Sequence, residues 1–387
     1  MKIDVRFNHS ELSSLSLFPS LKDKDDQTDT KPRGLQMPRA ALSKMAPEDD
    51  RHDANVACSI AELAASGHLR WTTSTPAVLF SDLVAIAEVN LPVARLYEGH
   101  INALRLIRTF GRPQLQWAVR QETDSGMLLG VWGAEGETPL SVEDGLLVGG
   151  KRFASGLGTV GKAVVTVGQG NTTRLALLDV SDSNRQRLAT WRKSGMRATV
   201  SGDFDAAGLP ASALDWIGSP GQYLQEPGFV GGVWRIAAVQ VGGTLGLLRA
   251  AADYLDGLGR LTTEAQVARL SPILTRALAA AEFTRRAALC AEGPEGRHAP
   301  EKAASFSAQA RLLTEDVGQD AIAAVERSVG LLHFDEDAAT GRIARDLATY
   351  MRQSARDALV QRSGTWALSQ TGPYSRLLEK EPSDALG

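Results

Sequence analysis

The sequence predicts an α+β protein that is mainly helical, with an N-terminal helical domain, a central antiparallel β domain and a C-terminal four-helix bundle. Two observations lead to this prediction. The spacing of apolar residues changes from a helical period near 3.6 to a period near 2 and back again along the chain. The short β-rich runs in the middle are separated by Gly, Asp, Asn and Ser, which are typical of turns. At 387 residues, the chain is long enough for about two or three domains.

The composition narrows the classes of protein to which the chain can belong. Hydrophobic residues make up 43% and charged residues 22% of the chain, which suffices for a buried core. Because 42 Lys and Arg residues stand against 45 Asp and Glu residues, the formal charge is −3, which argues against a nucleic-acid-binding protein. Two cysteines, Cys58 and Cys290, are too few for a zinc cluster, and the histidines show no metal spacing. We interpret His100, on an apolar helix stripe, as a half-buried core histidine and expect no metal site.

No segment has the composition of a membrane span or a secretion signal. The longest apolar stretch, around residues 230–248, is interrupted by Trp234, Arg235 and Gln240. The first 17 residues lack an apolar core of the length that a signal peptide needs. We therefore expect a cytoplasmic protein without a membrane span.

Residues 1–54 are predicted to form an extended or disordered arm. Most of this segment is polar and rich in helix and strand breakers, so it buries too little apolar surface to offset the entropy of ordering. Residues 55–125 are predicted to form the N-terminal helical domain. The pair at 81–82, Ser followed by Asp, is a candidate cap for one helix, and Pro92 marks the start of the next.

The middle of the chain, residues 126–227, is predicted to be the antiparallel β domain. Within it, residues 156–161 match the letters of a dinucleotide-binding fingerprint. That fingerprint needs a strand before it and a helix after it, whereas the β-rich run 163–167 follows here. We therefore interpret these glycines as a turn between two strands.

Residues 228–387 are predicted to form the C-terminal helical bundle and its tail. Apolar residues repeat with a period near 3.6 from about residue 233 to residue 248, and an Ala-rich helix follows over 265–291. Further helical segments over 305–332 and 341–362 complete four helices. The short loops between them imply antiparallel neighbours.

Four stretches, in their order and spacing, resemble motifs of the acyl-CoA dehydrogenase superfamily over about residues 55–365. They are residues 130–135, at the place of the family's Thr-Glu-Pro strand end; residues 150–156, similar to its Gly-x-Lys turn; residues 194–210, similar to its Gly-x-Arg hairpin; and residues 345–346, similar to the Arg-Asp pair of its late helices. The resemblance implies this three-part fold, a flavin enzyme with FAD between the β domain and the C-terminal bundle, and an acyl or acyl-CoA-like substrate.

The resemblance also implies which residues contact the cofactor and substrate. Carried over by position, they are Trp132, Gly133, Ala134, Phe153, Ala154 and Ser155 in the β domain, Arg327 and Gly330 in the bundle, and Arg197 beside the flavin and the substrate. A flat aromatic ring can cover a flavin face, a hydroxyl can hydrogen-bond its edge, and a guanidinium matches phosphate oxygens. Core packing is the alternative role for Trp132 and Phe153. The alternatives are a turn position for Ser155 and a solvated strand position for Arg197.

The family's catalytic carboxylate has no counterpart in this chain. Counted from the Arg-Asp pair at 345–346, the position of the usual Glu holds Ser354, and a hydroxyl cannot serve as the carboxylate base that removes an α-proton. Some members carry the Glu before an arginine on the first bundle helix, where this chain has Trp234. Glu226 lies upstream of that point and is the remaining candidate.

Three functions remain open. The first is α,β-dehydrogenation of an acyl thioester or related substrate by a flavin-dependent oxidoreductase with a non-standard base. The second is a flavin-dependent monooxygenase or oxidase of the same superfamily, which needs no such base. The third is a non-catalytic relative that has lost activity, because the family's Gln on a late helix and its segment reaching a neighbouring subunit's FAD are missing here.

Small residues in the bundle predict assembly. Residues 242–246 and 277–281 are rich in Gly and Ala and allow helices to approach closely. A lone bundle would expose apolar surface that a partner should cover. We therefore predict a homodimer or a dimer of dimers, joined through the C-terminal bundle.

Overall fold

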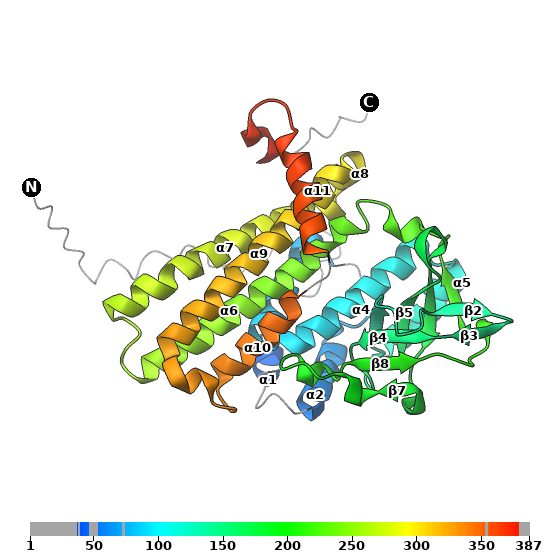
Figure 1. The fold of residues 1–387 in the computed structure, drawn as a ribbon, viewed down its shortest axis with the longest axis horizontal. Coiled ribbons are helices and arrows are strands. Elements are labelled where there is room, and N and C mark those ends of the chain that lie inside the picture. The colour runs from blue at the N-terminus through cyan, green and yellow to red at the C-terminus, as the bar shows by residue number, and fades with distance from the viewer. Residues whose placement is uncertain (1–36, 38, 46–52, 72–73, 353–354, 379–387) are drawn as a thin grey trace, which may run out of the picture. The chain divides into compact units, whose positions relative to one another are not determined.

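A computed structural model of the chain describes residues 37, 39–45, 53–71, 74–352 and 355–378, which lie within one compact unit, residues 34–387 (Figure 1). In this part of the chain, five helices come first, nine short strands follow, and a group of mostly long helices ends the fold. This order confirms the three-part α+β fold predicted from the sequence. None of the described helices combines the length and the apolar character that crossing a membrane requires.

The N-terminal helices begin at residues that suit helix starts. They are α1 (Arg39–Lys44), α2 (Asp53–Ala65), α3 (Pro76–Val89), α4 (Leu91–Phe110) and α5 (Pro113–Asp124). At the start of α4, the Asn90 side chain accepts the Val93 N–H. At the start of α3, Thr75 accepts the Val78 N–H. The pair at 81–82 therefore lies inside α3, and its assignment as a cap is wrong.

Part of the segment predicted as an extended arm is instead helical. α1 and the residues beside it bury Met37, Ala41 and Met45 in the core. The Met37 N–H donates to Asp82 Oδ1 at 2.9 Å, and Asn90 Nδ2 donates to the Met45 carbonyl at 2.8 Å. Because these contacts hold both ends of α1 against α3 and α4, the prediction is wrong for α1. The rest of the predicted arm up to residue 52 lies outside the described residues.

Nine strands, within the described residues, form three small sheets. They are β1 (Leu129–Trp132), β2 (Ser141–Glu143), β3 (Leu146–Val148), β4 (Gly150–Ala154), β5 (Lys162–Val167), β6 (Arg174–Asp179), β7 (Gln186–Arg187), β8 (Gly202–Asp205) and β9 (Asp215–Ile217). The sheets have the orders β1-β5-β6-β9, β4-β8-β7 and β2-β3. Strand pairs are antiparallel, as predicted, except β1 with β5, which is parallel. The parallel pair is possible because residues 133–161 form a long crossover that carries β2, β3 and β4.

The glycine-rich stretch 156–161 is the turn between β4 and β5, as interpreted from the sequence. Gly156 and Gly158 have φ angles of +80° and +79°, a left-handed conformation that residues with a side chain rarely adopt. The chain then enters β5 at Lys162 instead of a helix. The stretch therefore lacks the helix N-terminus on which a dinucleotide site depends.

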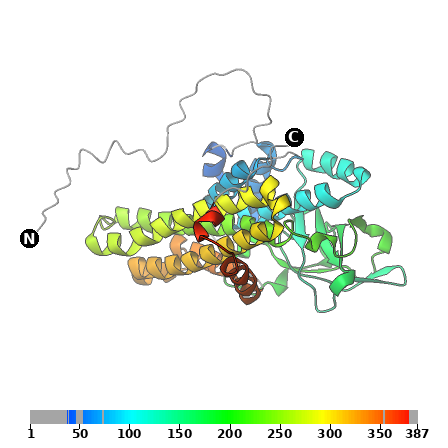
Figure 2. The same cartoon turned by 90° about the horizontal axis from the view of Figure 1, so that it is seen from above.

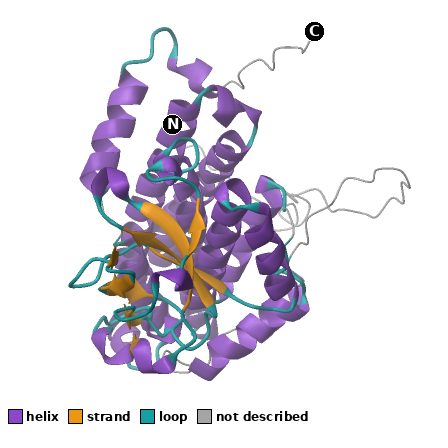
Figure 3. Ribbon diagram, turned by 90° about the vertical axis from the view of Figure 1, so that its right-hand side faces the viewer, coloured by secondary structure: helices purple, strands orange, loops and turns teal. Residues whose placement is uncertain are grey.

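The C-terminal helices are α6 (Trp234–Gly257), α7 (Glu264–Glu292), α8 (Pro294–His298), α9 (Pro300–Val329), α10 (Ala339–Met351) and α11 (Arg356–Leu368). α6, α7 and α9 run side by side, and α10 packs against α6 (Figures 1 and 2). The segment predicted as one helix over 341–362 is two helices, because the chain turns left-handed at Ala355, with φ +63°. α11 packs on α9. Seen from the β-domain side, the strands lie in front of the helices (Figure 3).

The small-residue face of α6 is covered within the chain by α3. A Cβ atom at Gly242 would lie 2.3 Å from the Val84 carbonyl oxygen, and one at Gly246 would lie 2.3 Å from the Glu88 carbonyl oxygen. These two glycines let the backbone of α3 pack directly on α6. The face therefore does not provide the subunit contact that its small residues predicted, while the oligomer itself stays a prediction.

Candidate functional site

A cavity of about 780 Å³ lies where the β domain meets α4 and α10. Its walls are β4 and the turn after it, the loop 191–201 between β7 and β8, one side chain of α4 and the C-terminal end of α10. The resemblance implied a cofactor at this boundary between the β domain and the bundle. Two of the residues implied to contact it, Phe153 and Ser155, line the cavity.

The backbone of β4 holds the Phe153 ring out of the core. Its φ angle is +53°, in the left-handed region, and 48% of the residue's surface is exposed. The ring meets Trp191 edge to face with centroids 6.1 Å apart, and the Lys193 ammonium lies 5.9 Å from the ring centre. A strained backbone thus keeps an aromatic surface open to the cavity, which is typical of a binding residue.

Hydroxyl groups line the wall beside Phe153. Ser201 Oγ donates to Ser155 Oγ at 3.2 Å, and the Thr199 and Ser201 hydroxyls lie 2.7 Å apart. Trp132 fixes one end of this row, because its Nε1 donates to the Ser155 carbonyl at 3.1 Å. The Trp132 ring is buried against the protein interior, so it has the core-packing role considered as its alternative.

The other three β-domain residues implied by the resemblance do not line the cavity. Gly133 and Ala134 follow β1 at the surface. Their carbonyl groups accept hydrogen bonds from Thr166 Oγ1 at 3.3 Å and from the Arg152 N–H at 3.0 Å. Ala154 is fully buried. These residues shape the backbone behind Phe153.

The Gly-x-Arg hairpin motif (194–210) and the Arg-Asp pair (345–346), which are far apart in the chain, meet beside the cavity. The Met196 N–H donates to Asp346 Oδ1 at 2.5 Å. Gly195 lies so close to α10 that a Cβ atom there would be 2.1 Å from the Arg345 carbonyl oxygen. The loop 191–201 is therefore fixed to α10, and the two walls keep their spacing.

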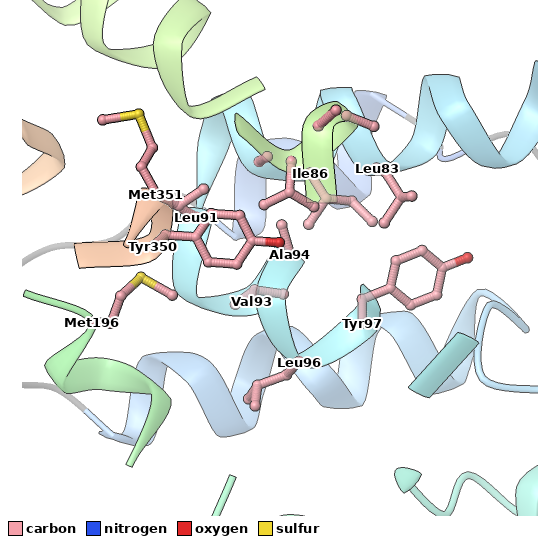
Figure 4. Close-up of a cluster of buried hydrophobic side chains, with 14 of the residues drawn as sticks. Leu83, Ile86, Leu91, Val93, Ala94, Leu96, Tyr97, Met196, Tyr350 and Met351 are labelled. Atoms are coloured by element: carbon pink, nitrogen blue, oxygen red, sulfur yellow. The ribbon is translucent and has the colours of Figure 1, made fainter. Parts of the chain in front are cut away.

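Tyr350, at the end of α10, lines the cavity, but its hydroxyl is buried inside the protein. Figure 4 shows its ring beside Met196, while Tyr97 of α4 points away from both. Burial raises the pKa of Tyr350 well above its ordinary value. The buried hydroxyl therefore stays protonated at neutral pH.

The charged side chains that line the cavity in the described part of the chain are cations. They are Arg95, Arg192, Lys193 and Arg352. Arg95 Nη1 donates to Glu98 at 2.9 Å, whereas Arg192 and Lys193 are exposed on the loop. The cavity therefore favours an anionic ligand. Among the described residues, no group of three His, Cys, Asp or Glu side chains is placed to hold a metal ion.

The candidate for the catalytic base, Glu226, does not line the cavity, and the position of the family's usual Glu, which holds Ser354, lies outside the described residues. The Glu226 carboxylate accepts the Val230 and Gly231 N–H groups at 3.2 and 3.0 Å. It also pairs with Arg362 at 3.0 Å. These contacts fix the chain at the start of the bundle, and Glu226 does not line the cavity.

Arg197, Arg327 and Gly330 also lie away from the cavity lining. Arg197 is exposed, and its Nε donates to the Lys193 carbonyl at 3.4 Å. Arg327 and Gly330 end α9 just before α10, whereas the cavity lies at the far end of α10. Because α10 has 13 residues, the two ends are about 20 Å apart along that helix.

Sequence reasoning missed several side chains of this wall, among them Arg95, Trp191 and Tyr350. A signal existed for the loop, because an aromatic residue and two cations stand together at 191–193, directly before the hairpin motif. Arg95 and Tyr350 lie on helices whose spacing is that of core-facing stripes. Their approach to the cavity depends on how α4 and α10 pack.

No family model and no curated protein matches the sequence. Solved structures do match. Dibenzothiophene monooxygenase TdsC from Paenibacillus sp. A11-2, in complex with FMN and indole, aligns with a TM-score of 0.68 and 16% identity over 88% of this chain and 98% of its own. Butyryl-CoA dehydrogenase from Megasphaera elsdenii aligns with a TM-score of 0.66 and 15% identity over 82% of this chain and 90% of its own.

A third solved structure extends the comparison to an enzyme complex with a nucleotide sugar. KijD3, in complex with FMN and dTDP-3-amino-2,3,6-trideoxy-4-keto-3-methyl-D-glucose, aligns with a TM-score of 0.68 and 17% identity over 86% of this chain and 92% of its own. At such identities the likeness shows the fold. It agrees with the order of the helices, the small sheets and the bundle. The chain therefore has the acyl-CoA dehydrogenase fold, as its sequence motifs predicted.

Proposed function

We propose that this protein is a flavin-dependent oxidoreductase whose flavin occupies the cavity beside Phe153 and Ser155. One observation supports the proposal above the others: an aromatic ring, a row of hydroxyls and several cations face the same cavity of about 780 Å³. A flavin is flat, forms hydrogen bonds along its edge and carries phosphate, so each feature has a counterpart. TdsC and KijD3, which share the fold, have been solved with FMN.

Each group of the wall has a distinct task in this proposal. Phe153 packs against a face of the ring system, and the hydroxyls of Ser155 and Ser201 hydrogen-bond to its edge. The cations at 192–193 pair with the phosphate. When bound, the flavin supplies the electron or hydride transfer that side chains cannot perform.

We propose FMN as the flavin in preference to the FAD that the resemblance implied. Arg327 and Gly330, which were expected to meet FAD, lie at the end of α9 and do not line the cavity. Chromatography of the flavin released by denaturation tests this choice. FMN is the expected product, and recovery of FAD would contradict it.

The lining favours a monooxygenase or oxidase over an acyl-thioester dehydrogenase. Removal of an α-proton needs a base, and the charged groups that line the cavity within the described residues are cations. Oxygen-dependent flavin chemistry needs no such carboxylate, and TdsC is a dibenzothiophene monooxygenase. Dehydrogenation with a non-standard base is the second candidate, because butyryl-CoA dehydrogenase shares the fold.

Absorbance spectroscopy of the purified protein loaded with FMN tests the proposal. For a monooxygenase or oxidase, the flavin absorbance is expected to persist when acyl-CoAs are added without oxygen. Bleaching by acyl-CoAs would contradict this choice and support the dehydrogenase. Failure to bind FMN and FAD alike would overturn the proposal in favour of a non-catalytic relative with the same fold.

We also infer that two or four copies assemble through the C-terminal bundle. α7 carries exposed apolar side chains on one face, at Val267, Leu274 and Leu278. Their spacing of seven and four residues places them on one stripe of the helix. Such a stripe is unfavourable in water, and a second bundle would cover it.

A further inference from the structure

A second cavity lies on another part of α4 and shares no described lining residue with the first. It has a volume of about 190 Å³ and lies between the start of α3, the middle of α4, the start of α6 and the end of α7. At about 30 Å³ per molecule, this volume corresponds to roughly six waters. The proposed flavin chemistry does not use this cavity.

Guanidinium groups dominate the polar side of this cavity. Arg105, Arg108 and Arg235 line it, whereas Glu292 is the single carboxylate among its described lining residues. Arg235 Nη1 donates to Glu292 Oε1 at 2.6 Å. Arg105 Nε donates to Glu292 Oε2 at 3.1 Å. Because one carboxylate is shared by two arginines and a third faces the same space, the lining carries a surplus of positive charge.

Arg235 gives the clearest indication of a ligand. Only 4% of the residue is exposed. Its Nε donates to Asn102 and its Nη1 to Glu292, whereas its Nη2 has no hydrogen-bond acceptor among the described residues. Gly232 leaves room beside this group, since a Cβ atom there would lie 2.5 Å from Nη2. An anion in the cavity would give Nη2 a charged acceptor.

The remaining walls add a helix end and an apolar surface. Ser74 and Pro76 line the cavity at the start of α3, a helix of 14 residues whose N-terminus carries partial positive charge. Leu79, Ile101 and Leu104 provide the apolar surface. The cavity therefore combines cationic donors with apolar contacts in a small volume.

A chain of polar contacts joins the two cavities along α4. Glu98 accepts hydrogen bonds from Arg95 and from Asn102, and Asn102 accepts one from Arg235. We refer to these four residues as the α4–α6 polar chain. Arg95 lines the first cavity and Arg235 the second. A substitution that tests one cavity should therefore lie outside this chain of contacts, because a change within it would affect both cavities.

We propose that the second cavity binds a small carboxylate whose apolar body packs against Leu79, Ile101 and Leu104. Paired carboxylate oxygens match the parallel N–H groups of a guanidinium, which here include the unpaired Nη2 of Arg235. The apolar surface distinguishes such a ligand from a fully polar anion, because a polar ligand would leave that wall without contacts. This site is independent of the flavin.

Calorimetric titration of the full-length protein with benzoate at constant ionic strength tests the proposal, with inorganic phosphate as the second probe. Benzoate is expected to bind saturably and more tightly than phosphate. Arg105→Gln is expected to raise the benzoate Kd at least about ten-fold, a change of about 1.4 kcal/mol. Arg192→Gln, which removes a cation from the first cavity, is the matched control and is expected to leave that Kd unchanged.

Glu292→Gln tests whether the net positive charge of the cavity strengthens benzoate binding. The amide removes the negative charge and frees guanidinium donors, so the benzoate Kd is expected to fall several-fold. A purely structural role for the arginine cluster predicts a higher Kd, because the ion pairs that orient Arg105 and Arg235 are lost. Thermal unfolding without a probe checks that each variant is folded.

The proposal would be overturned by no saturable binding to the wild type, an unchanged Kd in Arg105→Gln, or a raised Kd in Glu292→Gln. Phosphate binding that is tighter than benzoate binding would overturn the assignment of a carboxylate with an apolar body. Loss of binding in Arg192→Gln alone would move the ligand to the first cavity and equally contradict the proposal.

Discussion

Phe153 and Ser155 test the flavin proposal at single side chains. Ser155→Ala removes one hydrogen bond and is expected to weaken flavin binding by about 0.5–1.5 kcal/mol. Phe153→Ala is expected to weaken it more, because it removes the aromatic surface. Phe153 is half exposed, so its loss should leave the melting temperature almost unchanged. Fluorescence titration with FMN measures both effects.

Leu146→Ala is the matched control for Phe153→Ala. Leu146 is a similarly exposed apolar residue of the β domain, at 48%, and does not line the cavity. Its replacement should not change flavin affinity. Unchanged affinity in both Phe153→Ala and Ser155→Ala would show that the ring system binds elsewhere.

Asp82 makes stability depend on pH. Burial raises the pKa of its carboxyl from 3.8 to about 7, although the Met37 N–H donates to it. A raised folded-state pKa means that Asp82 stabilises the fold fully below about pH 4, and that this contribution is lost as the pH rises towards 7. Asp82→Asn removes the buried charge. It is therefore expected to stabilise the protein at pH 8 by up to about 4 kcal/mol.

The advantage of Asp82→Asn is expected to disappear by pH 4, where the wild-type carboxyl is protonated. Chemical denaturation of both proteins at pH 4 and pH 8 measures the difference in the free energy of unfolding. A difference that is equal at both pH values would contradict the explanation by charge burial. Destabilisation at pH 8 would show that the carboxylate gains more from its neighbour His68, 3.9 Å away, than its burial costs.

His100 and Phe153 show what the sequence can predict about a single residue. His100 was interpreted as a core histidine from its place on an apolar stripe. It is buried, with Nε2 at 2.9 Å from the Leu69 carbonyl and Nδ1 accepting the Leu129 N–H at 3.0 Å. The open position of Phe153 depends on a left-handed backbone and on Trp191 in another loop, which local spacing does not encode.

At the scale of the element, α1 is a test of how much a short helix contributes. Met45 is fully buried beside α1, and its carbonyl accepts a hydrogen bond from Asn90. Met45→Ala is expected to lower the free energy of unfolding by about 2–5 kcal/mol, because it leaves a cavity in the core. Leu331→Ala, at a residue that is 83% exposed, is the control and should change it little. Similar effects of both substitutions in urea denaturation would contradict the packing of α1.

The prediction failed at α1 because the segment is polar on average. Its buried residues, Met37, Ala41 and Met45, are spaced four apart, so they form one helical stripe within that polar segment. This spacing was a usable signal. The break between α10 and α11 had none, because no Gly or Pro marks Ala355 and the apolar spacing continues across it.

At the scale of the whole molecule, the order of elements and motifs predicted the fold. The hairpin and the Arg-Asp pair, matched separately in the sequence, contact each other through Met196 and Asp346. The site was less predictable, because its charges come from three separate parts of the chain: Arg95 on α4, the loop residues 192–193, and Arg352 after α10. Only the packing of α4 and α10 against the β domain brings these charges together.

Assembly is the prediction that belongs to this scale. Light scattering at micromolar concentration is expected to give a dimer or a tetramer. Replacing Leu274 and Leu278 together by Glu places charges on the exposed stripe of α7 and is expected to shift the protein towards the monomer. Leu188→Glu, at an exposed position in the β domain, is the control. A monomeric wild type would contradict the prediction.

The α4–α6 polar chain also sets the register between these two helices. Apolar side chains alone allow one helix to slide along another at small cost, since many contacts are simply exchanged for others. A slide of one turn, about 5.4 Å, would separate Arg235 of α6 from Asn102 of α4 and leave the buried Arg235 Nε without this acceptor. The hydrogen bond between Arg235 and Asn102 thus specifies one alignment of α4 on α6.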